Sequence, residues 1–214
     1  MYYSASMNTL DESLMNAVKE GKLLESSRTN NSTVGALSLF PVCPIAHEAV
    51  EELAAAGEWQ ELNDRFYKTL AFGTGGLRGR TIGSIVTRAE QGNGGVNGRP
   101  EYPCVGTACM NYFNVGRAMR GLIIYVNKHV EATDPGRKPR LVIGHDTRHF
   151  SRDFAEFCAK IGTDLGCDIY LFDSPRATPE ISFAIRELHQ EDIKSICDFC
   201  DSLNIRVIPE IDMP

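Results

Sequence analysis

Between residues 140 and 188, the sequence alternates twice between a short apolar run and an amphipathic segment. Residues 140–144 and 168–172 are apolar runs suited to buried strands. A helical pattern follows each of them: one runs from Ser151, which can cap it, to Gly166, and the other opens at Thr178-Pro179. This order predicts a parallel sheet with right-handed crossovers. Ligands of such sheets bind beyond the carboxyl ends of the strands, where residues 144–151 and 173–178 fall.

The alternation fails after Leu188. A third strand is due there, but residues 189–192 lead into another amphipathic helix at 193–203, and a strand follows only at 205–208. A sheet that lacks this strand leaves an edge and apolar helix faces uncovered, which favours self-association. The strand at 205–208 could fill the gap.

The segments before residue 140 are mainly helical in pattern. Helices are predicted at 11–20, 46–56 and 58–70, and a long buried helix at 115–130 that ends near Asp134. Residues 26–44 are rich in Ser, Thr, Asn and Pro, which predicts a loop.

Glycine is concentrated between residues 73 and 106, which hold ten of the 19 glycines. The run FGTGGLRG at 72–79 adds a hydroxyl and Arg78 to four of them. Glycines let backbone N–H groups converge on an anion, and an arginine fork suits phosphate oxygens. The alternative is a structural turn, since neither a P-loop nor a dinucleotide motif is present.

Composition excludes several classes of function. The formal net charge is −6, so no basic field exists to hold nucleic acid or an anionic membrane, and no apolar run is long enough to span a bilayer. The seven cysteines are odd in number and irregularly spaced, and Cys104, Cys158 and Cys167 have apolar or small neighbours, as buried reduced thiols do. Cys197 and Cys200 form a CxxC on the apolar face of the predicted helix at 193–203, where core packing is favoured over redox or metal chemistry. We expect a cytoplasmic protein.

Two more loops carry chemistry at the predicted sheet edge. His145, Asp146, Arg148 and His149 follow the first strand, and Arg176 follows the second. The two histidines have no evident third ligand and are interpreted as polar loop residues rather than a metal site. Asp146 and Arg148 either form a local ion pair that pins the loop or take part in catalysis.

Together, the three loops resemble the first domain of the α-D-phosphohexomutase superfamily, the phosphoglucomutases and phosphomannomutases. The matching stretches are FGTGGLRG at 72–79, LVIGHDTRHFSRDFA at 141–155 and YLFDSPRATPEISFAIREL at 170–188. The resemblance implies a three-layer α/β/α domain with a mixed, mainly parallel sheet over 71–188, truncated at its end. An N-terminal helical extension over 1–70 precedes this domain, and a foreign helix-strand tail over 189–214 follows it.

The resemblance also implies an activity and a site. The family transfers a phosphoryl group between the 1- and 6-positions of a hexose through a phosphoserine, a hexose 1,6-bisphosphate and Mg²⁺. By this match, the ligand is a hexose phosphate or the bisphosphate. The residues of the cleft would be Thr74, Gly75, Arg78, Asp146 and Arg148, with Arg176 and Thr178 shaping its wall.

The sequence departs from the family where the chemistry is done. No Ser-His pair followed by Asn-Pro occurs, and the magnesium loop of three alternating aspartates is missing. Ser174 and Ser182 belong to other elements, so no residue takes the role of phosphoryl carrier, and no metal ligand is assigned. We expect a phosphohexomutase fragment that is inactive alone. The alternatives are a non-catalytic module for phosphate, phosphosugar or another chain, and a chimeric fragment without selected function.

The end of the chain has a different resemblance. EDIKSICDFCDSLNIRVIPEIDMP at 191–214 is similar to a helix and strand of the β-N-acetylhexosaminidase barrel. Glu210 and Asp212 would then lie at a strand's carboxyl end, where barrel sites form. The catalytic Asp-Glu pair of that family is absent, so glycosidase activity is not expected. A coincidental match in a short amphipathic segment is the alternative.

Overall fold

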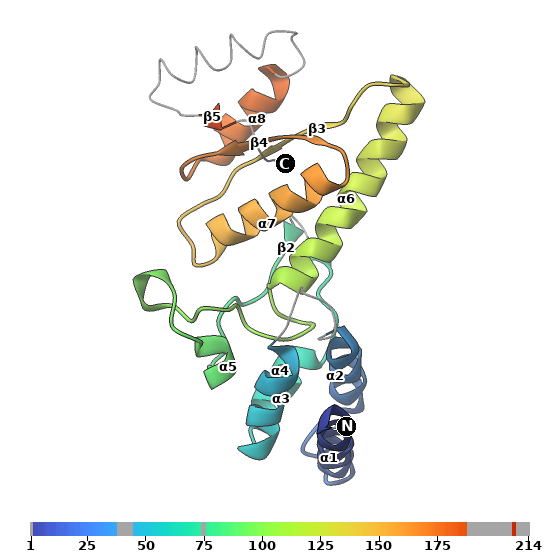
Figure 1. Cartoon of the computed structure of the whole chain (residues 1–214), viewed down its shortest axis with the longest axis vertical. Coiled ribbons are helices and arrows are strands. Elements are labelled where there is room, and N and C mark those ends of the chain that lie inside the picture. Colours follow the sequence, from blue (N-terminus) through green and yellow to red (C-terminus); the bar gives the residue numbers. More distant parts are fainter. Residues whose placement is uncertain (1, 38–44, 74–75, 188–206, 209–214) are drawn as a thin grey trace. The chain divides into compact units, whose positions relative to one another are not determined.

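The computed structural model describes residues 2–37, 45–73, 76–187 and 207–208, and it divides the chain into two compact units. The first unit comprises Met1–Asn114 and the second Val115–Pro214. Figure 1 labels the helices and strands of both units. The domain boundaries predicted at residues 70 and 188 stay predictions.

Four helices form the first part of unit 1: α1 (Tyr2–Lys19), α2 (Glu25–Leu37), α3 (Ala46–Ala55) and α4 (Trp59–Phe66). Their apolar faces pack into one core. Its largest members are Leu14, Leu23, Val50, Leu53, Leu62 and Phe66. The three predicted N-terminal helices are confirmed, although α1 begins earlier than predicted and α4 ends four residues sooner. The end of α4 is set by tertiary contacts, because Ala108 donates its N–H to the Arg65 carbonyl and Asn30 donates to that of Phe66.

Helix α2 replaces most of the loop predicted at 26–44, and that prediction is wrong for residues 26–37. Ser27 and Asn31, one helical turn apart, are both buried, and the Asn30 amide Nδ2 lies 2.7 Å from the Phe66 carbonyl oxygen of α4. Small polar side chains therefore form the inner face of this helix. Composition alone points to a loop because Ser and Asn favour turns when nothing packs against them.

The rest of unit 1, up to Asn114, holds little regular structure. It contains the antiparallel pair β1 (Phe72–Gly73) and β2 (Gly76–Leu77), the short helix α5 (Arg88–Gln91) and the 3-10 turn η1 (Val96–Gly98). Two glycines here are required by close approach. A Cβ atom at Gly83 would lie 2.2 Å from Arg65 Nη2, and one at Gly106 would lie 2.6 Å from the Arg65 carbonyl oxygen.

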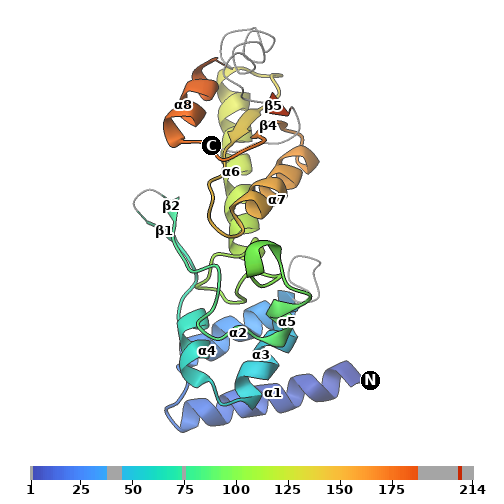
Figure 2. The ribbon, with the colours of Figure 1, turned by 90° about the vertical axis from the view of Figure 1, so that its left-hand side faces the viewer.

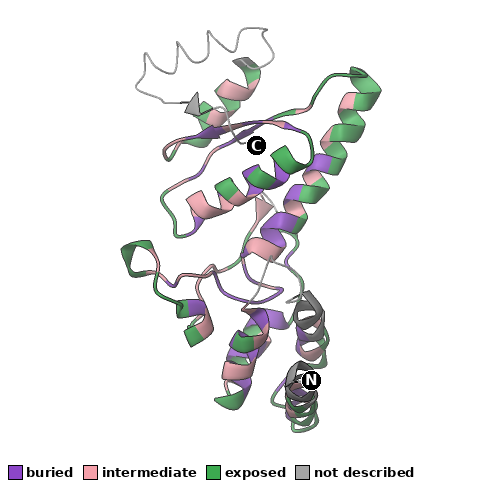
Figure 3. Cartoon of the chain, in the orientation of Figure 1, coloured by how far each residue is buried: buried purple, intermediate pink, exposed green. Residues whose placement is uncertain are grey.

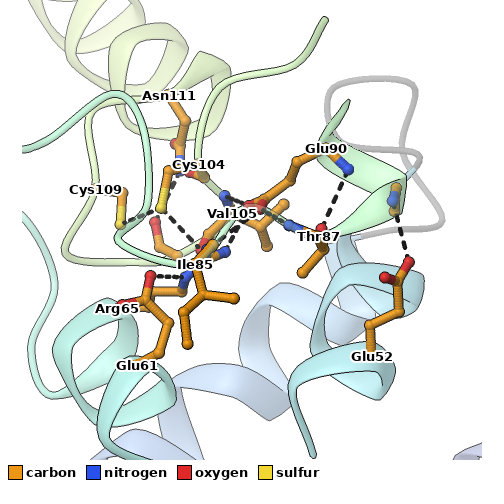
Figure 4. Close-up of polar contacts among 12 residues, drawn as sticks. Glu52, Glu61, Arg65, Ile85, Thr87, Glu90, Cys104, Val105, Cys109 and Asn111 are labelled. Carbon is orange, nitrogen blue, oxygen red and sulfur yellow. Dashed lines mark hydrogen bonds and ion pairs between the residues drawn. The ribbon is translucent and has the colours of Figure 1, made fainter. Parts of the chain in front are cut away.

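Arg65 joins the helices of unit 1 to this irregular segment (Figure 4). Its side chain is 0% exposed, and its Nε lies 2.8 Å from Glu61 Oε1. Its Nη1 lies 2.5 Å from Glu90 Oε1, and its Nη2 donates to the Ile85 carbonyl. Burial opposes the charge, but the hydrogen bonds and attraction of the Glu90 and Glu61 carboxylates outweigh it, so the pKa of Arg65 is raised.

Glu90 extends the same cluster into the backbone. Its carboxylate accepts the N–H groups of Val105 and Thr87, and the Thr87 hydroxyl accepts the Glu90 N–H, which is the reciprocal capping box of α5. Arg80 also reaches Glu61, with Nη2 3.1 Å from Oε2. These bonds hold residues 80–105 against α4, although the segment contains little regular secondary structure of its own.

Unit 2 is a three-layer α/β/α domain, as predicted. The parallel strands β3 (Arg140–Ile143) and β4 (Asp168–Phe172) pair with Leu141 opposite Ile169. Helix α8 (Thr178–Glu187) covers the face that carries Val142, Tyr170 and Phe172. Helices α6 (Tyr112–Thr133) and α7 (Ser151–Asp164) lie on the other side of the strands (Figure 2).

The strand predicted at 205–208 is confirmed at β5 (Val207–Ile208), which pairs antiparallel with the end of β4 and makes the sheet mixed. The predicted helix at 193–203, with Cys197 and Cys200, lies outside the described residues. The expected self-association stays a prediction.

Helix α6 confirms the predicted long helix and its end, but the helix is not buried throughout. Val115, Met119 and Ile123 are buried, whereas Ile124 and Tyr125 are more than half exposed. Figure 3 shows burial concentrated in the N-terminal half of α6. The periodicity identifies the helix correctly, but it does not report how far the neighbouring helix extends along it. No helix among the described residues is both long and apolar enough to cross a membrane.

The Arg65 cluster predicts a large cost for losing its cation. Arg65→Met leaves Glu90 buried without its charged partner, so we expect the free energy of unfolding to fall by about 3–5 kcal/mol. Urea unfolding followed by the fluorescence of Trp59, the single tryptophan of the chain, reports directly on unit 1.

The matched control is Arg88→Met, because the Arg88 side chain is 92% exposed and its ion pair with Glu52 is worth about 1 kcal/mol or less. Equal, small losses in the two variants would contradict the structural role given to Arg65.

Candidate functional site

The candidate site lies where β3 and β4 end side by side. Ile143 pairs with Leu171 near the carboxyl ends of both strands, and residues 144–150 and 173–177 continue from this edge. The Arg176 N–H donates to the His145 carbonyl at 3.0 Å, which ties the second loop directly to the first. The structure thus brings together, within unit 2, the loops that carry the predicted residues Asp146, Arg148 and Arg176.

Asp146 shapes the first loop. Its Oδ1 accepts the Arg148 N–H at 3.0 Å, its Oδ2 lies 2.7 Å from Arg148 Nε, and its own N–H donates to the Ser151 hydroxyl. The local ion pair, one of the two interpretations left open by the sequence, is therefore present. It does not bury the arginine, because the Arg148 side chain is 86% exposed and can still meet a ligand.

These contacts also set the protonation of Asp146. Burial opposes its ionisation, but the Arg148 N–H, the Ser151 hydroxyl and the Arg148 guanidinium outweigh it, so the pKa of Asp146 lies below its ordinary value. The carboxylate is the form that holds the loop.

The turn into α7 differs from the prediction that Ser151 caps the helix. Helix α7 begins at Ser151, and the residue before it is Phe150, in the left-handed conformation at φ 66°. The Ser151 hydroxyl is used instead by the Asp146 N–H. A bulky residue rarely adopts positive φ. Here the Phe150 ring is buried and stacks on Phe154 at 5.9 Å, which offsets the backbone cost.

Arg176 is held against the end of β4. Its side chain is only 15% exposed, its Nη2 lies 3.7 Å from Asp173 Oδ1, and its guanidinium lies 5.9 Å from the Phe172 ring centroid. Its Nε is buried and has no hydrogen-bond partner among the described residues. A buried N–H without an acceptor is uncommon in proteins and is the kind of group that a ligand satisfies.

Arg152 is a residue that the sequence reasoning missed. Its Nη1 donates to the Asp173 carbonyl and lies 3.4 Å from His145 Nε2, and its Nε pairs with Glu156 at 2.6 Å. It thus bridges the two loops from the first turn of α7. The signal was its position: a cation in the first turn of a helix opposes the helix dipole and needs another reason to be there.

The other predicted residues at this edge of the sheet make few contacts with the two loops in the described structure. Thr178 is exposed and begins α8, with Glu180 accepting the Ala177 N–H. His149 is exposed, whereas His145 is buried. In the described ranges, no group of three His, Cys, Asp or Glu side chains is arranged to hold a metal ion.

The glycine-rich loop belongs to unit 1. Phe72 pairs with Leu77 and Gly73 with Gly76 in the short antiparallel pair of β1 and β2. The predicted ligands Thr74 and Gly75 lie outside the described residues. Arg78 is exposed, directly after β2. Its expected place in one cleft with Asp146 and Arg148, which lie in the other unit, stays a prediction.

The fold and this edge define an α/β/α domain with three arginines, Arg148, Arg152 and Arg176, around the carboxyl end of its sheet. The chain belongs to the phosphoglucomutase/phosphomannomutase family. Residues 91–197, half of the chain, match the family described as "Phosphoglucomutase/phosphomannomutase, alpha/beta/alpha domain I". The match extends nine residues beyond Leu188 and does not include the glycine-rich loop at 72–79.

Curated relatives agree with this family. The phosphoglucomutase of Staphylococcus epidermidis is 30% identical over 132 residues, which are 62% of this chain and 19% of that protein. The phosphoglucomutase of Staphylococcus aureus strain USA300 is 30% identical over 129 residues, 60% of this chain and 18% of that protein. The chain thus matches about a fifth of the length of these relatives. No solved structure matches. The resemblance of residues 191–214 to a hexosaminidase segment stays a prediction, and Glu210 and Asp212 lie outside the described residues.

The geometry of Asp146 predicts a measurable titration. Its carboxyl ¹³C resonance should titrate below the ordinary aspartate value of about 3.9. Because the folded pKa is depressed, the stabilisation of the loop is present above the unfolded value and is lost as the pH falls through the folded value. Arg148→Ala should move the titration toward the ordinary value, whereas Arg186→Ala, on the exposed end of α8, should not. An ordinary titration of Asp146 in the unaltered chain would refute the loop geometry.

Proposed function

We propose that this chain supplies the phosphate-holding first domain of a phosphohexomutase, an enzyme that moves a phosphoryl group between the 1- and 6-positions of a hexose. The family match supports the assignment, and the arginines at the carboxyl edge of the β3–β4 sheet provide the chemistry. The ligand is a hexose phosphate or a hexose 1,6-bisphosphate.

The observation that carries this proposal is Arg176. Its guanidinium is largely buried and held in place by Asp173 and Phe172, while its buried Nε lacks an acceptor among the described residues. An arginine fixed in this way has lost its side-chain freedom before a ligand arrives, so binding costs less entropy. Phosphate oxygens match the fork of a guanidinium in both charge and geometry.

The neighbouring charges fit a phosphate better than a neutral ligand. Asp146 and Asp173 position arginines rather than facing an open site, because each lies within ion-pair distance of one. Arg152 adds a third cation whose position is fixed by the Asp173 carbonyl. Each of the three guanidinium groups has one carboxylate partner: Arg148 pairs with Asp146, Arg176 with Asp173 and Arg152 with Glu156. A phosphate group would meet three arginines that these carboxylates already hold in place.

Within these 214 residues, we assign binding rather than turnover. The hydroxyl of Ser174 donates to its neighbour Asp173, and that of Ser151 accepts the Asp146 N–H, so both are engaged in holding loops. The phosphoserine motif and the magnesium loop expected from the family do not occur in the sequence. Phosphoryl transfer would therefore depend on segments that carry these parts.

Calorimetry with glucose 1,6-bisphosphate tests the binding. We expect saturable heat for the unaltered chain. Loss of a hydrogen bond between charged groups costs about 1.5–3 kcal/mol, so Arg176→Ala should weaken binding about tenfold to a hundredfold. Arg186→Ala is the matched control, because this exposed arginine lies in the last turn of α8, away from the edge.

Arg78→Ala tests the glycine-rich loop separately, with the exposed Arg88→Ala as its control in the same unit. Unchanged heats for Arg78→Ala would remove that loop from the site, and unchanged heats for Arg176→Ala would remove the sheet edge. Absence of heat in the unaltered chain would overturn the proposed function.

The same chain should show no interconversion of glucose 1-phosphate and glucose 6-phosphate. The reason is the missing phosphoryl carrier, so adding glucose 1,6-bisphosphate and Mg²⁺ should not restore activity. A coupled assay for glucose 6-phosphate checks this with the purified chain. Turnover that disappears in Arg176→Ala would show that a carrier exists among these residues after all.

A further inference from the structure

Two buried cysteines of unit 1 lie in contact. Cys104 Sγ and Cys109 Sγ are 3.2 Å apart, both residues are free thiols, and their exposures are 1% and 0% (Figure 4). A disulfide bond has an S–S length of about 2.05 Å, so the two sulfurs need to approach by about 1 Å to bond. The proposed sugar-phosphate function makes no use of either thiol.

The turn that brings the two thiols together is fixed by side-chain hydrogen bonds. Asn111 Nδ2 donates to the carbonyls of Cys104 and Gly106, and Asn114 Nδ2 donates to those of Thr107 and Cys109. Four backbone carbonyls of this six-residue turn are therefore held by two buried amides. The backbone is already arranged for side chains at its two ends to meet.

Gly106 leaves the room that this contact requires. A Cβ atom at this position would lie 3.0 Å from Cys109 Sγ and 2.9 Å from Arg65 Cβ. Any larger residue would push the Cys109 sulfur or Arg65 from its place. The contact between the sulfurs is thus part of how the turn packs on α4.

The charges around the pair make the two thiols unequal. The hydrogen bond from Cys104, together with the Arg65 and Arg80 cations, outweighs burial and lowers the pKa of Cys109. The same hydrogen bond and burial raise the pKa of Cys104. Cys158 is a useful contrast, because burial alone raises its pKa to about 12. A thiol with a lowered pKa loses its proton more readily, and the deprotonated sulfur is the nucleophile in disulfide formation.

We propose that Cys104 and Cys109 are a redox modification site that closes to an intramolecular disulfide when the chain meets hydrogen peroxide. The Cys109 sulfur attacks one peroxide oxygen: an S–O bond forms, the O–O bond breaks, and the other oxygen leaves as hydroxide and takes up a proton to become water. The Cys104 sulfur then attacks the Cys109 sulfur, so that the S–S bond forms and the S–O bond breaks, releasing a second water. Two thiols are oxidised and one peroxide is reduced.

Access for peroxide follows from local structure. Residues 99–111 carry neither helix nor strand, so their opening does not require a helix or a sheet to unfold. The disulfide would cross-link the two ends of this turn. The turn also contacts residues 80 and 81, because Met110 and Cys104 donate their N–H groups to the carbonyls of Arg80 and Thr81. The oxidised chain should therefore unfold at higher urea concentration, as reported by Trp59.

Intact mass measurement of the full chain tests the proposal. After equimolar hydrogen peroxide, the reduced chain should lose two hydrogen atoms and regain them with dithiothreitol. No Lys or Arg separates the two cysteines, so trypsin leaves them in one peptide, which should be lighter by two hydrogens and closed to iodoacetamide. Cys158→Ser should behave like the unaltered chain.

Variants of each sulfur complete the test. Cys109→Ser should leave Cys104 reduced and open to iodoacetamide after unfolding, whereas Cys104→Ser should give a sulfenic acid at Cys109 that dimedone traps. The mass loss in the unaltered chain does not depend on how well these variants fold. The proposal is overturned if both thiols remain alkylatable after peroxide, if Cys109 passes to sulfinic acid without a disulfide, or if either cysteine pairs with another cysteine.

Discussion

The buried guanidinium of Arg65 is the contact on which the first unit depends. It is a cation without solvent exposure, and such a charge is tolerated only when it is paired and hydrogen-bonded on several sides. Glu61 supplies one partner from the same helix, and Glu90 supplies another from a short helix 25 residues later in the chain. Glu90 also accepts the Val105 N–H. The Arg65–Glu90 ion pair therefore holds together α4, α5 and the segment at Val105, which are not joined by strand pairing.

This arrangement explains why so many glycines occur in an irregular segment. Gly83 and Gly106 lie where any Cβ would collide with Arg65, so the chain can wrap the guanidinium closely from two sides. The same closeness brings Cys104 and Cys109 beside the cation. The hydrogen bond between the thiols and the charge of Arg65 make the pKa values of the two sulfurs unequal. The redox proposal rests on the 3.2 Å contact between these sulfurs in a turn whose carbonyls are held by Asn111 and Asn114.

Much of the fold could be predicted from periodicity, and the exceptions share a cause. Apolar spacing identifies α6 and α7, because each of them buries one face against a neighbour, and continuous apolar runs identify β3 and β4, which have helices on both faces. It fails for α2, whose inner face is made of Ser27 and Asn31, and for the end of α4, which is set by hydrogen bonds from distant residues. Both features depend on contacts with residues that are distant in the sequence, and a local sequence pattern carries no information about such contacts.

The candidate site, like the fold, could be predicted from the sequence only in part. Asp146, Arg148 and Arg176 could be assigned from loops that follow predicted strands, since parallel strands present their carboxyl ends at one edge. Arg152 was missed, because its place in the first helical turn is a weak signal and its role depends on reaching the Asp173 carbonyl across the sheet edge. The part played by Ser151 also differs from the sequence prediction, since its hydroxyl meets the Asp146 N–H and not the first turn of the helix.

We propose that the carboxyl edge of the β3–β4 sheet holds a sugar phosphate through arginines fixed before the ligand arrives. Amide chemical-shift mapping by NMR during titration with glucose 1,6-bisphosphate tests it most directly. In unit 2, we expect the shifts to concentrate in residues 145–152 and 173–178, with the Arg176 Nε–H among the most affected signals. Saturable shifts confined to other surfaces, such as the exposed half of α6, with no change at Arg176, would contradict it.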